Sequence, residues 1–349
     1  MERSKVRRLI VPPSAADQRL DNFIARTFKD LPKARIYRLI RRGEVRVNRG
    51  RVAPSHRLSS GDEVRIPPLD STPRKEPASA STQALSALEG TILHETPHLI
   101  VLNKPSGLAV HGGSGVRLGL IETLRQSRPH APYLELAHRL DRETSGCLII
   151  AKRRSVLRRL HEALRERSVN KTYLCVVQGL WRNPDSADAP LRKLTRGQSR
   201  SVQVDRAGGK PALTFFEPLD HWANGQGEGT LLRVALVTGR THQIRVHAAN
   251  AGHPLAGDER YGTRRFNRTM ASIGLRRLFL HAEKIELPAS VLGEKLVVHA
   301  PLTSDLEHVL HIVGCGVPKA ESTRRSPRKR KPRAYTQSRS RGENDDERA

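Results

Sequence analysis

The sequence predicts an α+β protein in which a small N-terminal domain precedes a larger domain built on a mixed, largely antiparallel sheet with a central cleft. Residues 17–68 are patterned as two short helices followed by short strands, whereas residues 91–316 alternate strands and helices in mixed order. The 349 residues are enough for one sizeable core and a small accessory domain.

The first block begins with a helical pattern. Asp17 is placed to cap a helix. Its apolar residues recur at helical spacing, namely Leu20, Phe23, Ile24 and Phe28. Short strands are expected at residues 45–48 and 63–66, the second after a Gly-Asp turn.

A second short helix is expected between Pro32 and Gly43, which suit the first and last positions of a helix. Ile36, Leu39 and Ile40 form its apolar stripe. Much of its remaining surface is basic and consists of Lys33, Arg35, Arg38, Arg41 and Arg42. Such a face suits the backbone of a folded RNA, although a helix kept in solution by its charge would have the same pattern.

Two segments have the composition of unstructured chain. Residues 69–90 are rich in Ser, Ala and Pro, which is typical of a linker. The chain after about residue 318 is polar and cannot bury enough apolar surface to become ordered. We therefore expect domains at residues 1–68 and 91–316, a flexible linker at 69–90 and a basic disordered tail at 317–349.

The second block mixes strands and helices. Strands are expected at residues 92–94, 99–102, 147–151 and 171–178, with a helix at 157–167 before the last of them. Residues 233–238 and 244–247 flank a polar turn. This order favours a largely antiparallel sheet over a regular parallel one.

The charge of the chain points to a polyanionic partner. Lys and Arg number 62 against 35 Asp and Glu, which leaves a net charge of +27. The tail from residue 318 has 11 basic and 5 acidic residues, a net of +6, so the other residues still carry +21. Basic side chains that neutralise phosphates release counterions, so a basic fold favours nucleic acid as partner over a surface selected only for solubility.

The cysteines and the apolar segments indicate an intracellular protein. Cys147, Cys175 and Cys315 are far apart, odd in number and lack metal-ligand spacing. The basic start MERSKVRRLI is not followed by an apolar core of signal-peptide length, and no apolar run approaches the ~20 residues that span a bilayer. We expect a cytoplasmic protein without a membrane partner.

The segment LAHRLDRETSGCLIIAK at residues 136–152 carries the first chemical signal. Asp141 lies between Arg139 and Arg142, just before a turn that leads into an apolar strand. A loop that ends at a buried strand holds a reactive group rigidly, and nearby arginines favour the charged carboxylate. Four isolated residues of this kind would more often be an Asp that caps a turn and pairs with Arg.

The full string resembles the signature of the pseudouridine synthase family that modifies ribosomal and some transfer RNAs. HRLD is followed two residues later by TSG and an aliphatic strand that ends in AK, with Cys147 at a usually aliphatic position. The resemblance implies that Asp141 is the essential catalyst. It also implies that Arg139 enters the RNA helix where the base leaves.

Three further segments resemble motifs of the same family. In ILHETPHLIVLNKPSGLAVHGG the resemblance implies a structural role for Lys104 and Pro105, and in KTYLCVVQG it implies that Tyr173 stacks on the target base. VTGRTHQIRVHAANAGHPLAGDERYG resembles the motif with the arginine that pairs with the catalytic Asp. We assign that role to Arg245, with Arg240 as the second candidate. Three other residues of this motif are expected to be structural, namely His247, His253 and Asp258.

The first block resembles the S4-type RNA-binding domain, in the pattern RLDNFIARTF followed by KARIYRLIRRGEVRVNRGRVAPSHRLSSGDEVRI. This resemblance implies that the basic helix contacts RNA. The expected partner is large-subunit ribosomal RNA or a pre-ribosomal particle, and we expect a monomer. The alternatives are the same chemistry on other ribosomal or transfer-RNA uridines, and a non-catalytic RNA-binding or ribosome-assembly factor.

The isomerisation that this resemblance implies requires no cofactor. The bond from ribose to N1 of uracil breaks, the ring rotates and a bond to C5 forms, so nothing is gained or lost. One carboxylate with an arginine partner suits this reaction better than glycoside hydrolysis, which usually needs two carboxylates. Attack on the ribose, attack on the base and removal of a ribose proton all remain open for Asp141. An aromatic residue such as Tyr173 offsets the cost of unstacking the target base, and its hydroxyl could help to remove the C5 proton.

Metal and nucleotide sites have little support in the sequence. The 15 His residues show no H-E-x-x-H pattern and there is no paired-Cys pattern, so we expect no metal. The segment HGGSGVRLG lacks the Gly-Lys-Ser/Thr ending of a phosphate-binding loop and is expected to be a turn.

Overall fold

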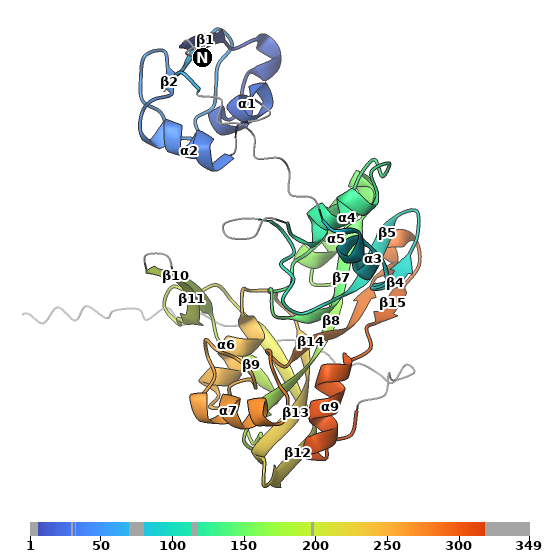
Figure 1. Ribbon diagram of the computed structural model, residues 1–349. Helices are drawn as coiled ribbons and strands as arrows, with labels where there is room; N and C mark the ends of the chain where they lie inside the picture. Colours follow the sequence, from blue (N-terminus) through green and yellow to red (C-terminus); the bar gives the residue numbers. More distant parts are fainter. Residues whose placement is uncertain are drawn as a thin grey trace, which may run out of the picture. The chain divides into compact units, whose positions relative to one another are not determined.

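The computed structural model describes residues 6–28, 31, 33–69, 80–112, 118–196 and 199–317. The chain divides into two compact units, Met1–Ser79 and Ala80–Ala349, which we call the N-terminal and the catalytic unit and describe separately (Figure 1). Residues 318–349 of the predicted tail lie outside the described residues.

The N-terminal unit packs two helices on one face of a small sheet. Its elements are β1 (Arg7–Ile10), η1 (Pro13–Ala15), α1 (Leu20–Thr27), α2 (Lys33–Arg41), β2 (Arg46–Val47) and β3 (Glu63–Ile66). The strands are antiparallel in the order β1-β3-β2. Ile36, Leu39 and Ile40 of α2 are buried against Val64 and Ile66 of β3, so the predicted apolar stripe is confirmed.

Two expectations for this unit differ from the structure. Asp17 does not cap α1, because the cap position is Arg19, and Asp17 instead has a left-handed backbone (φ 62°) and forms an ion pair of 2.9 Å with Arg57. Strand β1 was not expected, since RRLI does not alternate regularly between apolar and polar residues. Its Leu9 nevertheless packs on the core.

The catalytic unit has one large sheet and a separate two-stranded hairpin, β10–β11. Its helices are α3 (Thr82–Glu89), α4 (Leu120–Ser127), α5 (Arg154–Arg165), α6 (Gln243–Asn250), α7 (Arg264–Ser272), α8 (Ala289–Leu292) and α9 (Ser304–Val313). Its strands are β4 (Ile92–Glu95), β5 (Leu99–Lys104), β6 (Glu135–Leu136), β7 (Ser145–Ala151), β8 (Asn170–Gln178), β9 (Ser186–Asp188), β10 (Leu191–Arg196), β11 (Ser199–Val204), β12 (Leu213–Asn224), β13 (Gly227–Leu236), β14 (Leu280–Leu287) and β15 (Leu296–His299).

The large sheet is mixed, as predicted. In the described part of the chain it is ten-stranded, with the path β4-β5-β7-β14-β8-β13-β12-β9, while β15 pairs with β14 and β6 with β7. β7 and β14 run parallel and the other described pairs are antiparallel. Gly146 makes this pairing possible, because a Cβ there would lie 2.3 Å from the carbonyl oxygen of Ala282.

Helices cover the two ends of this sheet. Figure 1 shows α3, α4 and α5 around the end that contains β4, β5 and β7, and α6, α7 and α9 around the end that contains β12 and β13. The predicted strands at residues 92–94, 99–102, 147–151 and 171–178 correspond to β4, β5, β7 and β8. After the polar turn that follows β13, residues 244–247 belong to helix α6.

The linker prediction is wrong for its second half. Ser81 caps helix α3 by accepting a hydrogen bond of 3.2 Å from the backbone N–H of Ala84. Leu88 of this helix is only 4% exposed and belongs to the main core. The alanine-rich composition of residues 82–89 therefore reflects helix formation, and the burial of Leu88 supplies the tertiary contact that a short helix needs.

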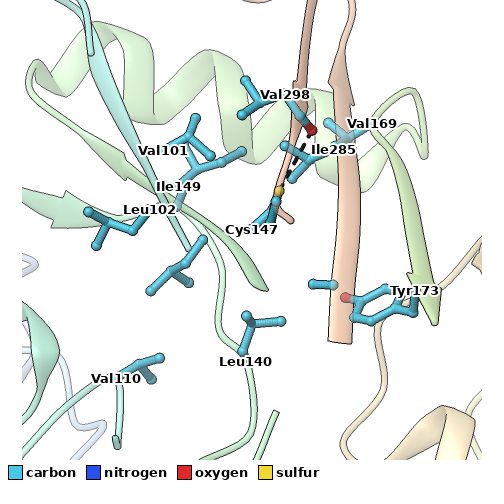
Figure 2. Packing of buried hydrophobic residues seen from close by; sticks show 14 of the residues in the cluster. Val101, Leu102, Val110, Leu140, Cys147, Ile149, Val169, Tyr173, Ile285 and Val298 are labelled. Atoms are coloured by element: carbon cyan, nitrogen blue, oxygen red, sulfur yellow. Dashed lines mark hydrogen bonds between the residues drawn. The ribbon is translucent and has the colours of Figure 1, made fainter. Parts of the chain in front are cut away.

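Strand β7 passes through the centre of the core. All seven of its residues are buried, and Figure 2 shows Cys147 directed at the backbone carbonyl of Val298, 3.6 Å from its sulfur. Burial raises the pKa of the Cys147 thiol to about 12, so this cysteine is a packing residue. The ring of Tyr173 on β8 belongs to the same apolar cluster (Figure 2).

Candidate active site

A pocket of about 520 Å³ lies beside the start of β7 in the catalytic unit. Asp141, Tyr173 and Arg245 line it together, although they are far apart in the sequence. Asp141 comes from the loop between β6 and β7, Tyr173 from β8 and Arg245 from α6. The three residues expected to carry the chemistry are thus gathered at one place.

The loop that carries Asp141 is held by its backbone. The carbonyl of Asp141 accepts a hydrogen bond of 3.1 Å from the N–H of Thr144, which closes the turn into β7. The carbonyl of Arg142 accepts hydrogen bonds from Lys104 Nζ at 3.0 Å and from the N–H of Gly107 at 2.9 Å.

Lys104 is fully buried and acts as the anchor of this loop. Its ammonium also donates to the carbonyls of Pro105 and Leu108, so three oxygens surround its three protons. Ser106 adds a hydrogen bond of 2.7 Å to the carbonyl of Glu143. The segment KPSG therefore fixes the backbone on which Asp141 is displayed.

Arg245 is positioned by a buried carboxylate. Its Nε and Nη2 each donate to Asp258 at 2.7 Å, and Nη1 lies 3.8 Å from Oδ2 of Asp141. Asp258 is 1% exposed and also accepts hydrogen bonds from the backbone N–H groups of Arg260 and Tyr261. Burial is the largest influence and opposes the ionisation of Asp258, but the hydrogen bonds and charge of Arg245 together with the two backbone N–H donors outweigh it, so the pKa of Asp258 lies below its ordinary value.

His242 is the second group that faces the Asp141 carboxylate. Its Nε2 lies 3.8 Å from Oδ2 of Asp141, and its Nδ1 lies 2.8 Å from the hydroxyl of Tyr261. The Tyr261 hydroxyl accepts a hydrogen bond of 3.0 Å from the backbone N–H of Val202 on β11. A chain of contacts therefore runs from the β10–β11 hairpin to Asp141.

The same contacts determine where His242 carries its proton. Burial lowers the pKa of His242 below its ordinary value, although Asp141 acts in the opposite direction, so the ring is neutral near pH 7. The Tyr261 hydroxyl accepts from Val202 and can donate its own proton to Nδ1. The proton of the neutral imidazole then lies on Nε2, directed at Asp141.

Tyr173 and Lys171 are neighbours on one face of β8, since they are two residues apart on a strand. Both line the pocket. Burial, and then the charge of Asp141, raise the pKa of Tyr173, so its phenol is protonated at neutral pH. Burial also lowers the pKa of Lys171. The pocket therefore has an aromatic wall that presents a hydroxyl, with an amine beside it.

The arginines around Asp141 in the sequence form no described ion pair with it. The Nε of Arg142 donates to the carbonyl of Gly107 at 2.8 Å, and Arg139 is exposed at the rim of the pocket. In the described part of the chain, the Asp141 carboxylate has an ion pair with Arg245 and a contact with the neutral ring of His242, both at 3.8 Å. Neither Arg139 nor Arg142 has a described ion pair with Asp141, so the expectation that these sequence neighbours hold the carboxylate is not met.

Arg240 lies at the rim and not beside Asp141. Its Nε donates to the carbonyl of Pro211 at 3.2 Å, and its backbone N–H donates to Gln243. Sequence analysis missed two further cations at the rim, Arg165 and Arg167 at the end of α5. Arg165 is the last residue of α5 and Arg167 lies in the turn after it, and this segment appeared only structural in the sequence. With Arg139 and Arg240 they surround the pocket with permanent positive charge.

The remaining predicted residues lie outside the pocket. Arg38 and Arg41 are exposed on α2, Arg42 is exposed just after it and Arg35 is partly buried on it, whereas the side chain of Lys33 is outside the described residues. His247 and His253 are bonded to backbone carbonyls, of Ala189 at 2.9 Å and of Gln178 at 2.8 Å, as expected of structural residues.

His242, Tyr261 and Lys171 are pocket or near-pocket residues that the sequence analysis did not single out. The sequence could have indicated Lys171, because it lies two residues before Tyr173 on the same strand and therefore on the same face. It could also have indicated His242, because this residue lies three positions before Arg245. Tyr261 had none, because its contacts join the motif to a hairpin about sixty residues earlier. Within the described ranges, no three His, Cys, Asp or Glu side chains cluster as metal ligands would. No helix in the described part of the chain is long and apolar enough to cross a membrane.

This arrangement suits chemistry on one uncharged planar ring attached to a polyanion. A carboxylate faces a fixed cation and a neutral imidazole, an aromatic ring forms one wall, and arginines at the rim can contact phosphates on either side of the bound group. A base that leaves its stack can be accommodated by such a wall.

The chain matches known families in both units. Residues 98–250 match the model described as RNA pseudouridylate synthase, and residues 18–64 match that of the S4 domain. The chain is 48% identical over 314 residues to "Ribosomal large subunit pseudouridine synthase C" of Escherichia coli (strain K12), a match that covers 88% of this chain and 97% of the relative. The protein of the same name from Pasteurella multocida (strain Pm70) is 47% identical over 309 residues, with 87% and 93% covered.

Solved structures of similar fold agree with this match. "Human RNA Pseudouridylate Synthase Domain Containing 4" superposes with a TM-score of 0.55 at 27% identity, covering 67% of this chain and 97% of that one. "Human RNA Pseudouridylate Synthase Domain Containing 1" gives 0.52 at 26% identity, covering 63% and 86%. The predicted S4-type and pseudouridine synthase resemblances are confirmed.

Proposed function

This chain belongs to the RNA pseudouridylate synthase family, and from that premise we propose that it converts specific uridines of large-subunit ribosomal RNA to pseudouridine, with Asp141 as catalyst. The RNA target rests on the relatives that are named for the large ribosomal subunit and match almost the whole of their own length. The role of Asp141 rests on one observation: its carboxylate faces both Arg245 and His242 at 3.8 Å inside the pocket.

The proposed reaction begins when the target uridine leaves its stack and enters the pocket. Arg139, Arg165, Arg167 and Arg240 at the rim bind the phosphates on either side of it, and the ring of Tyr173 packs against the uracil. Unstacking costs a few kcal/mol, and stacking on an aromatic ring returns about 1–3 kcal/mol per base.

Asp141 then acts on the bound nucleoside. The bond between C1′ of ribose and N1 of uracil breaks, the uracil turns, and a bond forms between C1′ and C5. C5 loses its proton and N1 gains one, so the reaction is balanced without a further reactant. The guanidinium of Arg245, which Asp258 fixes, holds the Asp141 carboxylate in place by its positive charge. The Nε2 proton of His242 faces the same oxygen of Asp141.

We propose that the Tyr173 hydroxyl assists the last proton transfer. Its phenol is protonated at neutral pH, so it accepts the C5 proton only if it passes its own proton onward. In the N-terminal unit, Lys33, Arg35, Arg38, Arg41 and Arg42 of α2 are proposed to contact the RNA backbone. That the protein acts as a cytoplasmic monomer stays a prediction.

The test is tritium release from C5-labelled uridine in unmodified large-subunit ribosomal RNA. Wild type should release tritium, and Asp141→Asn should not, while it still binds the RNA. Glu143→Gln is the matched control, because Glu143 is an exposed carboxylate two residues away and should leave release unchanged. Release from transfer RNA alone would overturn the ribosomal target, and normal release by Asp141→Asn would overturn the catalytic assignment.

A further inference from the structure

The outer face of the N-terminal sheet carries a row of arginines that neither the predicted RNA-binding helix nor the catalytic pocket uses. Arg8 of β1 pairs in register with Arg65 of β3, and Arg65 pairs with Arg46 of β2. Three arginines from three strands therefore lie side by side across the sheet. We call Arg8, Arg46 and Arg65 the arginine row.

The row lies on the face opposite to the helices. Along β3, Val64 and Ile66 are buried and belong to the core with α1 and α2, whereas Glu63 and Arg65 are partly exposed. Because side chains alternate across a strand, the arginine row projects from the other face. It is thus a surface separate from the basic face of α2.

The row lines a hollow of about 310 Å³ together with Arg49 and Glu63. Four arginines and one glutamate give this hollow a net charge of +3. Like charges directly opposite one another on neighbouring strands destabilise a sheet. Three arginines side by side therefore destabilise the sheet through charge repulsion, and an anion bound in the hollow would remove this repulsion.

Backbone contacts hold the row without neutralising it. Arg46 donates to the carbonyls of Gly43 and Arg49, at 3.2 and 3.3 Å, and Arg65 donates to the carbonyl of Glu44 at 3.2 Å. Arg8 meets Glu63 at 3.5 Å and its side chain is 62% exposed. Two guanidinium groups are thereby oriented in advance, and each retains further N–H donors for an anion.

We propose that the arginine row binds the phosphate backbone of the RNA as a second contact surface of the N-terminal unit. The identity of the polyanion rests on the RNA substrate proposed above. An extended ligand is favoured over a free phosphate ion because Ile10, which lies on the same face two residues from Arg8, is 64% exposed. A ribose or base of a bound strand can cover such a residue, whereas a single phosphate cannot.

The test measures the affinity of the full chain for unmodified large-subunit ribosomal RNA between about 50 and 200 mM salt. Arg8→Gln should weaken binding about fivefold at low salt and lower the slope of log K against log salt by about one. Arg8→Gln/Arg65→Gln should lower that slope by about two. Arg65→Lys keeps the positive charge and should keep most of the RNA affinity. A comparison of this variant with Arg8→Gln/Arg65→Gln therefore separates the effect of lost charge from the effect of lost folding.

Two further variants make the result decisive. Glu63→Gln removes the one carboxylate that lines the hollow and should therefore tighten RNA binding. This effect is opposite in sign to that of the arginine variants, and partial unfolding could not produce it. Arg26→Gln is the charge-matched control, because Arg26 is exposed on α1 away from the row, and it should change affinity less than Arg8→Gln. Unchanged slopes in the row variants, or weaker binding by Glu63→Gln, would overturn the proposal. Tritium release by the same proteins at saturating RNA reports separately on the proposed function.

Discussion

Asp258 binds Arg245 through two hydrogen bonds of 2.7 Å, whereas Arg245 approaches Asp141 only to 3.8 Å. The arginine is thus fixed by a fully buried structural carboxylate, and its remaining nitrogen is left for a carboxylate that borders the pocket. This asymmetry keeps Asp141 available to a substrate, because a direct ion pair of normal length would have to be broken first. It also predicts different consequences for the removal of the two carboxylates.

Asp258→Asn should destabilise the protein by about 3–5 kcal/mol, because Arg245 would remain in the interior without its charged partner. The measurement is chemical unfolding at neutral pH, compared with Asp141→Asn, which should change stability by less than about 1 kcal/mol. The pKa of Asp258 lies below its ordinary value of 3.8 in the fold, so its contribution is present above about pH 4 and is lost as the pH falls through the folded value. Equal destabilisation by the two variants would contradict the asymmetric roles.

Tyr261→Phe should lower turnover about fivefold to tenfold, because it removes a hydrogen bond worth about 1 kcal/mol that orients His242 toward Asp141. Turnover is to be measured at saturating RNA, so that binding does not enter. Tyr37→Phe is the control, since it removes a tyrosine hydroxyl bonded to Asp21 in the N-terminal unit and should leave turnover unchanged.

The pH dependence of turnover should report on His242. Because burial lowers its pKa, the neutral ring persists below the ordinary value of 6.5, and the acid limb of the pH–rate profile should lie below that pH. A donor to Nδ1 favours the neutral ring, so Tyr261→Phe should raise the pKa of His242 and move the acid limb to higher pH. A limb that does not move between the two proteins would show that His242 is not the group that titrates.

Tyr173→Phe separates the ring from its hydroxyl. The ring should still pack against the uracil, so RNA affinity should stay within about twofold, while loss of an assisting proton-transfer group should slow C5 release by about 10²-fold. Tyr173→Ala should in addition lose about 1–3 kcal/mol of stacking energy. If Tyr173→Phe turned over like wild type, the hydroxyl would have no part in proton removal.

A protein that begins at residue 80 should retain the chemistry but bind RNA more weakly. The catalytic unit contains the whole pocket, and the N-terminal unit is a separate compact body. Loss of the basic helix and of the arginine row should reduce affinity by about tenfold or more at 150 mM salt, since several phosphate contacts disappear together. Competition between cognate and noncognate RNA checks whether site choice is weakened as well.

Local patterns were sufficient for most of the fold, and the resemblance of three motifs to the pseudouridine synthase family supplied the three proposed catalytic residues. The strands at residues 92–94, 147–151 and 171–178 and the apolar stripe of α2 follow from side-chain periodicity, which acts over a few residues. The motif around Asp141 is contiguous and therefore visible in the sequence. Helix α3 was missed because its composition resembles a linker and its stability depends on the burial of Leu88 in a distant core.

The sequence by itself thus determined which residues are proposed for the chemistry, and the tertiary structure decided what lies around each of them. The arginines next to Asp141 have no described ion pair with it, while Arg245 and His242 reach it from the start of a helix about one hundred residues later. The arginine row likewise joins residues 8, 46 and 65 through strand register alone. Spacing along a chain sets only local directions, whereas contacts between distant segments depend on how the sheet closes and which side chains its faces bury.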